Sequence, residues 1–198
     1  MKNNLSRTIT ILKNGGVVIF PTDTVWGVGC RIDNVKSVSR VYQIRKRPLE
    51  KALPVLVSSL KQAKEYFDNV TEETASLLTS YWPGGLTVVY YANGQKVLPE
   101  VRGGGITVGL RMPNKQDLLE VIKKVGVPLL GPSANFSSEK TPTKKSELDP
   151  ELLKLVDYVM EGECDGNMSS TVIDCTKKPW EILRQGAVKI DPKYLQKH

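Results

Sequence analysis

The chain has 198 residues, the length of one domain with one hydrophobic core. Hydrophobic residues make up 40% of it and charged residues 25%, a composition that excludes a disordered or fibrous protein. The 28 Lys and Arg residues exceed the 21 Asp and Glu residues and give a net charge of +7, which favours anionic partners such as nucleotides or RNA without choosing between them.

The N-terminal region predicts a helix, a buried strand, a polar loop and a second helix. Apolar residues lie at helical spacing in 5–12, and the continuous apolar run 17–20 predicts a strand. Residues 21–29 begin with a proline and are expected to form the loop at the carboxyl end of that strand. Asp33 can cap the next helix, which leads into the basic segment 45–48.

The middle of the chain predicts a helix between short strands. A strand is expected over 53–57, and Thr71 can cap a helix that the Trp-Pro-Gly-Gly turn at 82–85 ends. Strands over 86–91 and 106–110 follow with no helix predicted between them.

The C-terminal third begins with an amphipathic helix that Gly126 closes. A polar loop at 131–135 comes next, and the polar stretch 137–150 predicts an exposed loop. A helix and a strand are expected after it, then the segment 169–174 and a last strand over 180–183.

This alternation of elements predicts the fold class. Helices interleaved with strands indicate an α/β sandwich with parallel strand pairs, and consecutive strands indicate antiparallel pairs as well. We therefore expect one domain over residues 1–198, with a twisted mixed parallel/antiparallel sheet and flanking helices.

Several classes of chemistry are disfavoured. No apolar run approaches the roughly 18 residues of a membrane span, and no secretion signal is visible, so we expect no membrane partner. Cys30, Cys164 and Cys175 are odd in number and lack metal-ligand spacing, which predicts no metal site and fits a cytoplasmic location. The single histidine is the terminal His198, so a histidine base is not expected.

Small polar residues and cations mark candidate binding segments. The loops 21–29, 131–135 and 169–171 are rich in hydroxyls, amides and glycine, which suit a phosphate or another polar ligand but also dominate ordinary turns. Arginine side chains near predicted strand or helix ends could hold a triphosphate or form a solvated basic face. The cations concerned are Arg45, Lys46, Arg47, Lys51, Arg111 and Arg184.

Seven short motifs stand in order along most of the chain. They are Pro21-Thr22-Asp23-Thr24 with Trp26-Gly27, Arg45-Lys46-Arg47-Pro48, Trp82-Pro83-Gly84-Gly85-Leu86-Thr87, Arg111-Met112-Pro113, Ser133-Ala134-Asn135, Ser170-Thr171-Val172-Ile173-Asp174 and Leu183-Arg184-Gln185-Gly186. Each motif is weak alone, but the ordered set resembles the YrdC-domain threonylcarbamoyl-AMP synthases in their short, single-domain form.

The resemblance implies a YrdC-like fold with a basic cavity and an L-threonylcarbamoyladenylate synthase activity. Such an enzyme joins L-threonine, bicarbonate or CO2, and ATP into threonylcarbamoyl-AMP and pyrophosphate for the threonylcarbamoyladenosine (t6A) modification of tRNA. We expect Mg²⁺ to accompany ATP, because charge on the phosphates must be neutralised. The implied partners are the proteins of a tRNA-modification transferase complex, and tRNA or other RNA could also bind.

The resemblance also implies roles for residues at the matching positions. The implied catalytic set is Arg45, Arg47, Ser133 and Asn135. The implied ATP contacts are Arg47, Lys51, Thr107, Ser133, Thr141 and Arg184. The implied threonine contacts are Thr24, Arg111, Gly131 and Ser170.

Four positions depart from the family pattern. Arg45 replaces a lysine, Trp26 a tyrosine and Gly85 a proline, and Leu56 stands where many members have a histidine that helps to hold threonine. The amino-acid specificity is therefore open. The length and polarity of 137–150 suggest that this loop closes over ligands.

Two other functions remain open. The same basic concavity could bind structured RNA without catalysis, and RNA binding would weaken steeply with salt. A different carbamoyl chemistry, as in the related domain of hydrogenase-maturation carbamoyltransferases, is disfavoured by the intact Ser-x-Asn motif and by the lack of zinc-finger cysteines.

Overall fold

The structure of the chain is a computed structural model that describes residues 2–196, with side chains from residue 4 onward. His198 lies outside the described residues. The helices are α1 (Lys2–Lys13), α2 (Val35–Ile44), α3 (Leu60–Tyr66), α4 (Glu72–Tyr81), α5 (Gln116–Val125) and α6 (Pro150–Lys154), with 3-10 turns at Lys145–Glu147 and Pro192–Tyr194. Among the described helices, none combines the length and the apolar character that a membrane crossing requires.

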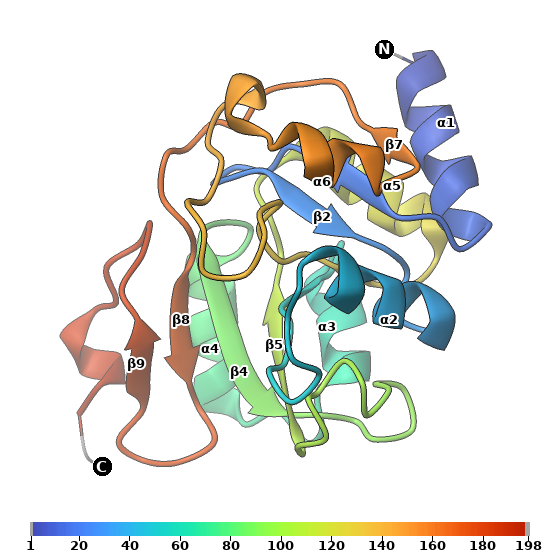
Figure 1. Cartoon of the computed structure of the whole chain (residues 1–198). Coiled ribbons are helices and arrows are strands. Elements are labelled where there is room, and N and C mark those ends of the chain that lie inside the picture. Colours follow the sequence, from blue (N-terminus) through green and yellow to red (C-terminus); the bar gives the residue numbers. More distant parts are fainter. Residues whose placement is uncertain (1, 197–198) are drawn as a thin grey trace.

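The strands form two mixed sheets (Figure 1). They are β1 (Val18–Phe20), β2 (Gly27–Gly29), β3 (Val55–Leu56), β4 (Leu86–Tyr91), β5 (Thr107–Arg111), β6 (Leu129–Leu130), β7 (Tyr158–Val159), β8 (Thr171–Asp174) and β9 (Glu181–Arg184). The smaller sheet has the order β2-β1-β7 and the larger one β6-β3-β5-β4-β8-β9. Pairs β1/β7, β3/β5 and β4/β8 are parallel and the others antiparallel, which confirms the predicted mixed architecture.

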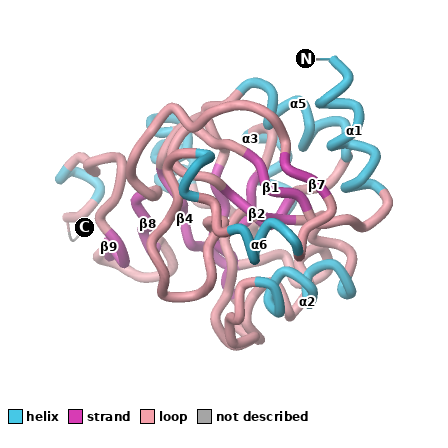
Figure 2. Tube along the Cα trace, turned by 45° about the horizontal axis from the view of Figure 1, so that its top comes forward, coloured by secondary structure: helices cyan, strands magenta, loops and turns pink. Residues whose placement is uncertain are grey.

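Helices cover the sheets unevenly. In Figure 1, α3 and α4 lie behind the larger sheet, and Figure 2 shows α1 and α5 together beside the smaller one. Strand β1 is buried on both faces, which explains its continuous apolar sequence. Its side chains alternate: Ile19 joins the main core, whereas Val18 and Phe20 join a second core with α1 and α5. Helices α3 and α4 therefore leave the front face of the larger sheet uncovered, and a cleft lies there.

The prediction of one long loop over 21–29 is wrong at its end, where β2 forms. The backbone N–H of Val28 donates to the carbonyl of Pro132 at 2.9 Å, so β2 also meets the segment that follows β6. A Cβ atom at Gly29 would lie 1.8 Å from the carbonyl oxygen of Leu130. Glycine therefore permits an approach that brings two polar loops together, although its lack of a side chain hides the strand from sequence patterns.

Helix ends show how local chemistry decides boundaries. Thr71 caps α4 as predicted, and Gly126, with φ of 91°, ends α5. The cap of α2 is Asn34 and not Asp33, whose carboxylate binds the Arg31 guanidinium instead. Helix α3 is an element that the sequence pattern does not predict.

Candidate functional site

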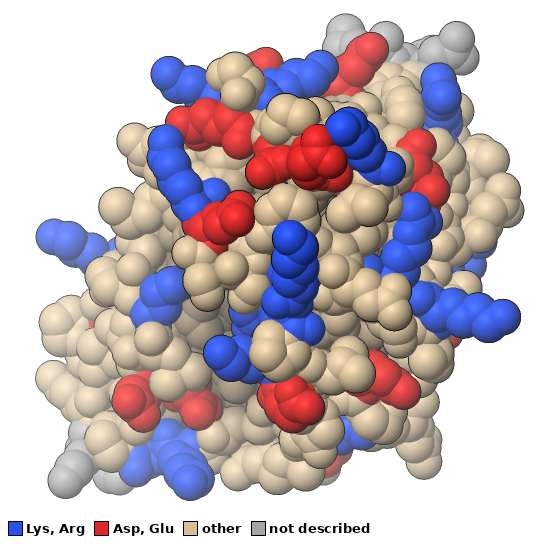
Figure 3. Space-filling view, in the orientation of Figure 1, with Lys and Arg blue, Asp and Glu red and all other residues tan. Residues whose placement is uncertain are grey.

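A cleft of about 280 Å³ opens where the two sheets meet. Basic side chains lie at the centre of the face in Figure 3, and acidic ones are set around them. The predicted site residues that line the cleft are Arg45, Arg47, Arg111, Gly131, Ser133, Asn135, Thr141, Ser170 and Arg184. They come from the end of α2, β5, the loop after β6, the start of β8 and the end of β9, so the fold gathers motifs that are far apart in sequence.

The end of α2 directs two arginines into the cleft. Lys46 adopts a left-handed conformation with φ of 49°, and backbone N–H groups of Lys46 and Arg47 return to the last turn at 3.0 Å. This pair of hydrogen bonds is a Schellman motif, which usually has glycine at the left-handed position. Because the chain turns here, Arg45 and Arg47 both line the cleft, whereas the Lys46 ammonium lies 4.3 Å from the centre of the Phe136 ring.

Arg45 is a buried cation, with only 5% of its surface exposed. Its Nε donates to the carbonyl of Asn135 at 3.0 Å, and Nη2 donates to Oδ1 of Asn135 at 3.2 Å and to Oγ of Ser133 at 3.4 Å. Burial, together with the nearby charge of Arg47, lowers the pKa of Arg45 to about 10. Within residues 2–196 no carboxylate pairs with Arg45, so an anionic ligand would be stabilised here.

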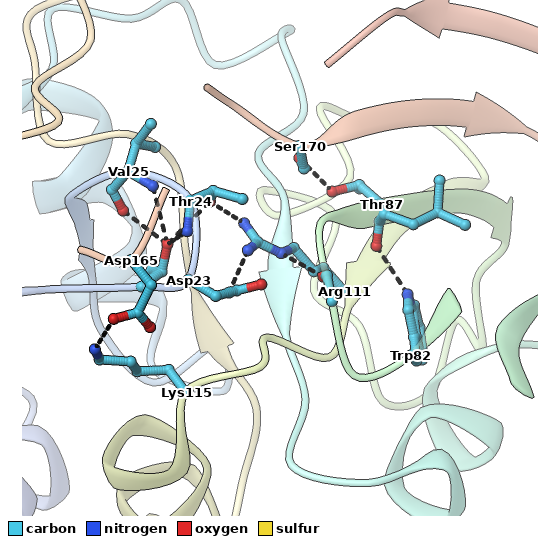
Figure 4. Close-up of polar contacts among 12 residues, drawn as sticks. Asp23, Thr24, Val25, Trp82, Thr87, Arg111, Lys115, Asp165 and Ser170 are labelled. Carbon is cyan, nitrogen blue, oxygen red and sulfur yellow. Dashed lines mark hydrogen bonds and ion pairs between the residues drawn. The ribbon is translucent and has the colours of Figure 1, made fainter. Parts of the chain in front are cut away.

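Arg111 is equally buried but has a carboxylate partner (Figure 4). Its Nε donates to the carbonyl of Gly84 at 3.0 Å, Nη1 donates to Oγ1 of Thr24 at 2.7 Å, and Nη2 binds the carboxylate of Asp23. Burial lowers the pKa of Arg111, while Asp23 opposes that shift. Thr24, a predicted threonine contact, is itself buried and contacts Arg111 without lining the cleft.

Thr22 shapes the loop that carries Asp23. Its Oγ1 accepts from the backbone N–H of Thr24 at 3.0 Å and of Val25 at 3.2 Å, and it donates to the carbonyl of Val25 at 2.8 Å. A hydroxyl that closes a turn in this way fixes the neighbouring side chains. The threonines of this motif therefore serve the shape of the loop.

Arg184 and Ser170 line another part of the cleft. Arg184 donates from Nε at 3.1 Å and from Nη2 at 2.9 Å to the carbonyl of Ser170, whose Oγ lies 2.9 Å from Oγ1 of Thr87. Desolvation lowers the pKa of Arg184. Thr87 also lines the cleft, although its motif gave no reason to single it out.

A second cavity of about 250 Å³ adjoins the first along the open sheet face. Its lining is partly apolar and includes Pro54, Val89 and Gly109, and it shares Arg47 and Arg184 with the cleft. An apolar floor between two guanidinium groups suits a planar ring attached to phosphates. The predicted ATP contact Thr107 lies in this second cavity.

Lys51 lines neither cavity. Its side chain is exposed, while its backbone carbonyl accepts hydrogen bonds from Arg47 Nε and from the Tyr42 hydroxyl, each at 3.2 Å. Glu139, which the motifs do not single out, is the only Asp or Glu among the described residues that line the cleft. Its position in an irregular loop left no pattern by which to find it.

A family model named Sua5_yciO_yrdC and described as "Telomere recombination" matches residues 10–186. The chain belongs to this Sua5/YciO/YrdC family. The match covers every motif identified in the sequence, from the loop after β1 to the glycine after β9.

Relatives within the family carry a synthase name. A "Threonylcarbamoyl-AMP synthase" of Bacillus subtilis is 30% identical over 93% of this chain and 54% of its own length. One of Pyrococcus abyssi is 31% identical over 91% and 53%, and one of Stenotrophomonas maltophilia is 30% identical over 85% and 91%. The chain thus spans about half the length of the first two relatives and most of the third.

Solved structures share the fold. Pyrococcus abyssi Sua5 complexed with L-threonine superposes with a TM-score of 0.87 at 30% identity, over 92% of this chain and 54% of that one. Escherichia coli YciO gives 0.84 at 24% identity over 99% and 94%, which supports the fold alone. The mixed sheet with flanking helices is therefore the fold of the family.

Two departures from the family pattern lie inside the protein. Leu56 is 1% exposed and forms part of the cleft wall, where a Cβ atom at Gly131 would lie 2.3 Å from its Cγ. Trp26 is fully buried, and its indole N–H has no hydrogen-bond partner among the described residues. Leu56 therefore gives the cleft wall an apolar side chain, whereas Trp26 lies in the core and does not line the cleft.

The loop 137–150 lies along one edge of the cleft. The backbone N–H of Ser137 donates to the carbonyl of Arg45 at 2.7 Å, and Nδ2 of Asn135 donates to the carbonyl of Glu139 at 2.7 Å. The carbonyl of Pro142 accepts from the backbone N–H of Trp26 at 3.0 Å. These contacts tie the loop to two motifs, and its closure over ligands stays a prediction.

Proposed function

We propose that the chain is an L-threonylcarbamoyladenylate synthase, a nucleotidyltransferase that uses L-threonine, bicarbonate or CO2, and ATP. The observation that carries the proposal is the buried guanidinium of Arg45, which lacks a carboxylate partner in the described chain and shares a cleft with Arg47 and Arg184. Such a group favours a polyanion, since each charge-assisted hydrogen bond is stronger away from water. The names of the relatives and the threonine complex of the Pyrococcus abyssi protein support this reaction.

In this reaction the bonds form and break between the substrates, and the protein forms no covalent intermediate. The amine nitrogen of threonine bonds to the carbon of CO2 and loses a proton, which gives a carbamate. A carbamate oxygen then bonds to the α-phosphorus of ATP while the bond to the bridging oxygen of pyrophosphate breaks. The side chains bring the substrates together and balance the charge that grows on the phosphates.

We assign the amino acid to the Arg111 end of the cleft. A carboxylate suits the N–H groups of Arg111 that remain after its contacts with Gly84, Thr24 and Asp23. The backbone at Gly131 and the hydroxyl of Ser170 complete this end.

We assign ATP to the remaining length of the cleft. The triphosphate would contact Arg45, Arg47 and Ser133, with Asn135 holding Arg45 in place. The adenosine suits the second cavity, which Thr107, Arg47 and Arg184 line, while Thr141 lines the adjoining cleft. The Lys51 ammonium, on an exposed segment, would reach the phosphates only by moving toward the cleft.

Mg²⁺ would enter with ATP. No group of three His, Cys, Asp or Glu side chains suited to a metal occurs within residues 2–196, whereas Glu139 and the hydroxyl groups of Ser133 and Thr141 line the cleft. These donors fit an ion that keeps most of its ligands from phosphates and water, as Mg²⁺ does with nucleotides. The ion would neutralise charge on the departing pyrophosphate.

The reactivity of the product suggests which proteins would receive it. A mixed anhydride of this kind hydrolyses readily, so we propose transfer to proteins of a tRNA-modification transferase complex in the cytoplasm. The net charge of +7 would also favour tRNA or other RNA near the cleft.

Pyrophosphate release tests the proposal. Mg-ATP and bicarbonate are supplied with threonine, serine, alanine or no amino acid, and we expect release that depends on threonine and is lost in Ser133→Ala. Absence of release with every amino acid, despite measurable ATP binding, would contradict the synthase and favour RNA binding, which steep salt dependence would reveal.

A further inference from the structure

The two ends of the cleft differ in charge balance. Arg111 and Asp23 form the most buried ion pair of the described residues, with side chains 7% and 11% exposed. Arg45 and Arg47, at the other end, have no carboxylate partner among residues 2–196. Asp23 therefore balances the charge of Arg111, whereas Arg45, Arg47 and Arg184 have no paired carboxylate among these residues, although Glu139 also lines the cleft.

A neighbouring segment packs against the backbone of the loop that carries Asp23. The backbone N–H of Asp165 donates to the carbonyl of Thr22 at 3.3 Å. A Cβ atom at Gly166 would lie 2.7 Å from the carbonyl oxygen of Asp23 and 3.0 Å from Cα of Thr24. The segment around Gly166 thus packs directly on the loop, and Figure 4 shows Asp165 beside that loop and bonded to Lys115.

Charge decides which anion a guanidinium prefers. A free arginine attracts a phosphate with two charges more strongly than a carboxylate with one. Next to Asp23, Arg111 still offers N–H groups, but the neighbouring negative charge opposes a polyanion more than it opposes a zwitterion, whose ammonium compensates for it. The fixed pair would therefore accept an amino acid and exclude a phosphate.

We propose that Asp23 is a specificity-determining residue that acts through Arg111: it neutralises one end of a cleft lined by four arginines, so that the amino acid binds there and phosphates bind at Arg45 and Arg47. The inference rests on the proposed function. It assigns Asp23 a role in sorting the two substrates and no role in the bond-making steps.

Competition between phosphate and threonine tests the proposal. Threonine binding is measured by titration calorimetry with and without inorganic phosphate, on the wild type, Asp23→Asn and the control Asp165→Asn. The Asp23→Asn side chain keeps an oxygen for Arg111 but lacks the charge. We expect phosphate to leave threonine affinity unchanged in the wild type and in the control, and to weaken it about tenfold in Asp23→Asn.

Two further variants guard against a folding defect. Asp23→Asn with Arg111→Gln removes both charges, which is less disruptive than removing one partner of a buried pair. This double variant should lose threonine binding and show no new phosphate site. Thr24→Val removes a hydroxyl that Arg111 contacts but keeps both charges, so it should not admit phosphate.

Three results would overturn the inference: phosphate competition already in the wild type, no competition in a folded Asp23→Asn, or no threonine binding by the wild type. Threonine binding without pyrophosphate release would contradict the proposed reaction alone, since the sorting is read from binding.

Discussion

At the scale of single residues, Ser133 has a hydroxyl that is nearly free for a ligand. Its Oγ lies in the cleft and accepts one long hydrogen bond, 3.4 Å, from Arg45. Ser80, away from the cleft, instead bonds the Ser76 carbonyl at 2.9 Å and the Tyr194 hydroxyl at 2.9 Å. Ser133 is therefore placed to bind a ligand, whereas Ser80 makes hydrogen bonds that stabilise the fold.

We expect Ser133→Ala to lower kcat by a factor on the order of 10² to 10³, because a donor to the reacting phosphate is removed. Its melting temperature should stay near that of the wild type. Ser80→Ala should behave in the opposite way, with lower stability by about 1 kcal/mol and normal turnover. Steady-state kinetics and thermal unfolding measure both, and equal rate losses would contradict the assignment.

Lys46 holds the turn that presents Arg45 and Arg47, and its φ of 49° strains any residue other than glycine. Lys46→Ala and Lys46→Gly both lose the contact with Phe136, but only glycine relieves the strain. We expect the glycine variant to be more stable than the alanine variant by about 1 kcal/mol. Denaturant unfolding checks this, and equal stability would mean that the turn is not strained.

At the scale of elements, the loop 137–150 is organised by one carboxylate. Lys140 donates to Glu147, and so do the backbone N–H groups of Thr143 and Lys144. These hydrogen bonds lower the pKa of Glu147 from 4.5 to about 2. The cluster fixes the part of the loop that follows the cleft-lining residues.

A carboxylate whose pKa is depressed by folding stabilises the folded loop above its unfolded pKa and loses that effect as pH falls. We therefore expect the amide resonances of Thr143 and Lys144 to shift between pH 4.5 and about 2. Glu147→Gln should show the shifted state at neutral pH, while Glu151→Gln, on the exposed surface of α6, should not. A titration midpoint near 4.5 would contradict the cluster. NMR spectra recorded across this pH range provide the test.

At the scale of the whole molecule, the cleft collects positive charge from elements that close only in the folded state. Arg45, Arg47 and Arg184 approach one another without carboxylate partners among the described residues, which opposes folding until an anion binds. A ligand at 100 times its Kd stabilises a protein by about 2.7 kcal/mol.

We accordingly expect pyrophosphate at 100 times its Kd to raise the melting temperature by about 5–11 °C, because each kcal/mol raises it by about 2–4 °C in a chain of this length. Sodium chloride at the same ionic strength should have little effect, and Arg47→Ala should reduce the shift. Differential scanning calorimetry measures all three conditions. An equal shift with chloride would indicate general screening.

The sequence predicted those helices and strands whose spacing, caps and end residues lie within the element itself. Helical spacing, the Thr71 cap and the stop at Gly126 give α4 and α5, because these effects act within one turn of chain. The ordered motifs indicated the family, and alternating helices and strands gave the mixed sheet. Most predicted site residues line one cleft for the same reason: each follows a recognisable strand or helix end.

Only the tertiary structure decided which distant groups meet. Asp23 and Arg111 are 88 positions apart, and no local pattern pairs them. Strand β2 pairs with β1, and Gly29 lets the Leu130 backbone approach its other side. The Lys51 side chain lies outside the cavities although its motif suggested a ligand contact. Such outcomes depend on long-range packing, which fixes loops and charges only once the sheets have assembled.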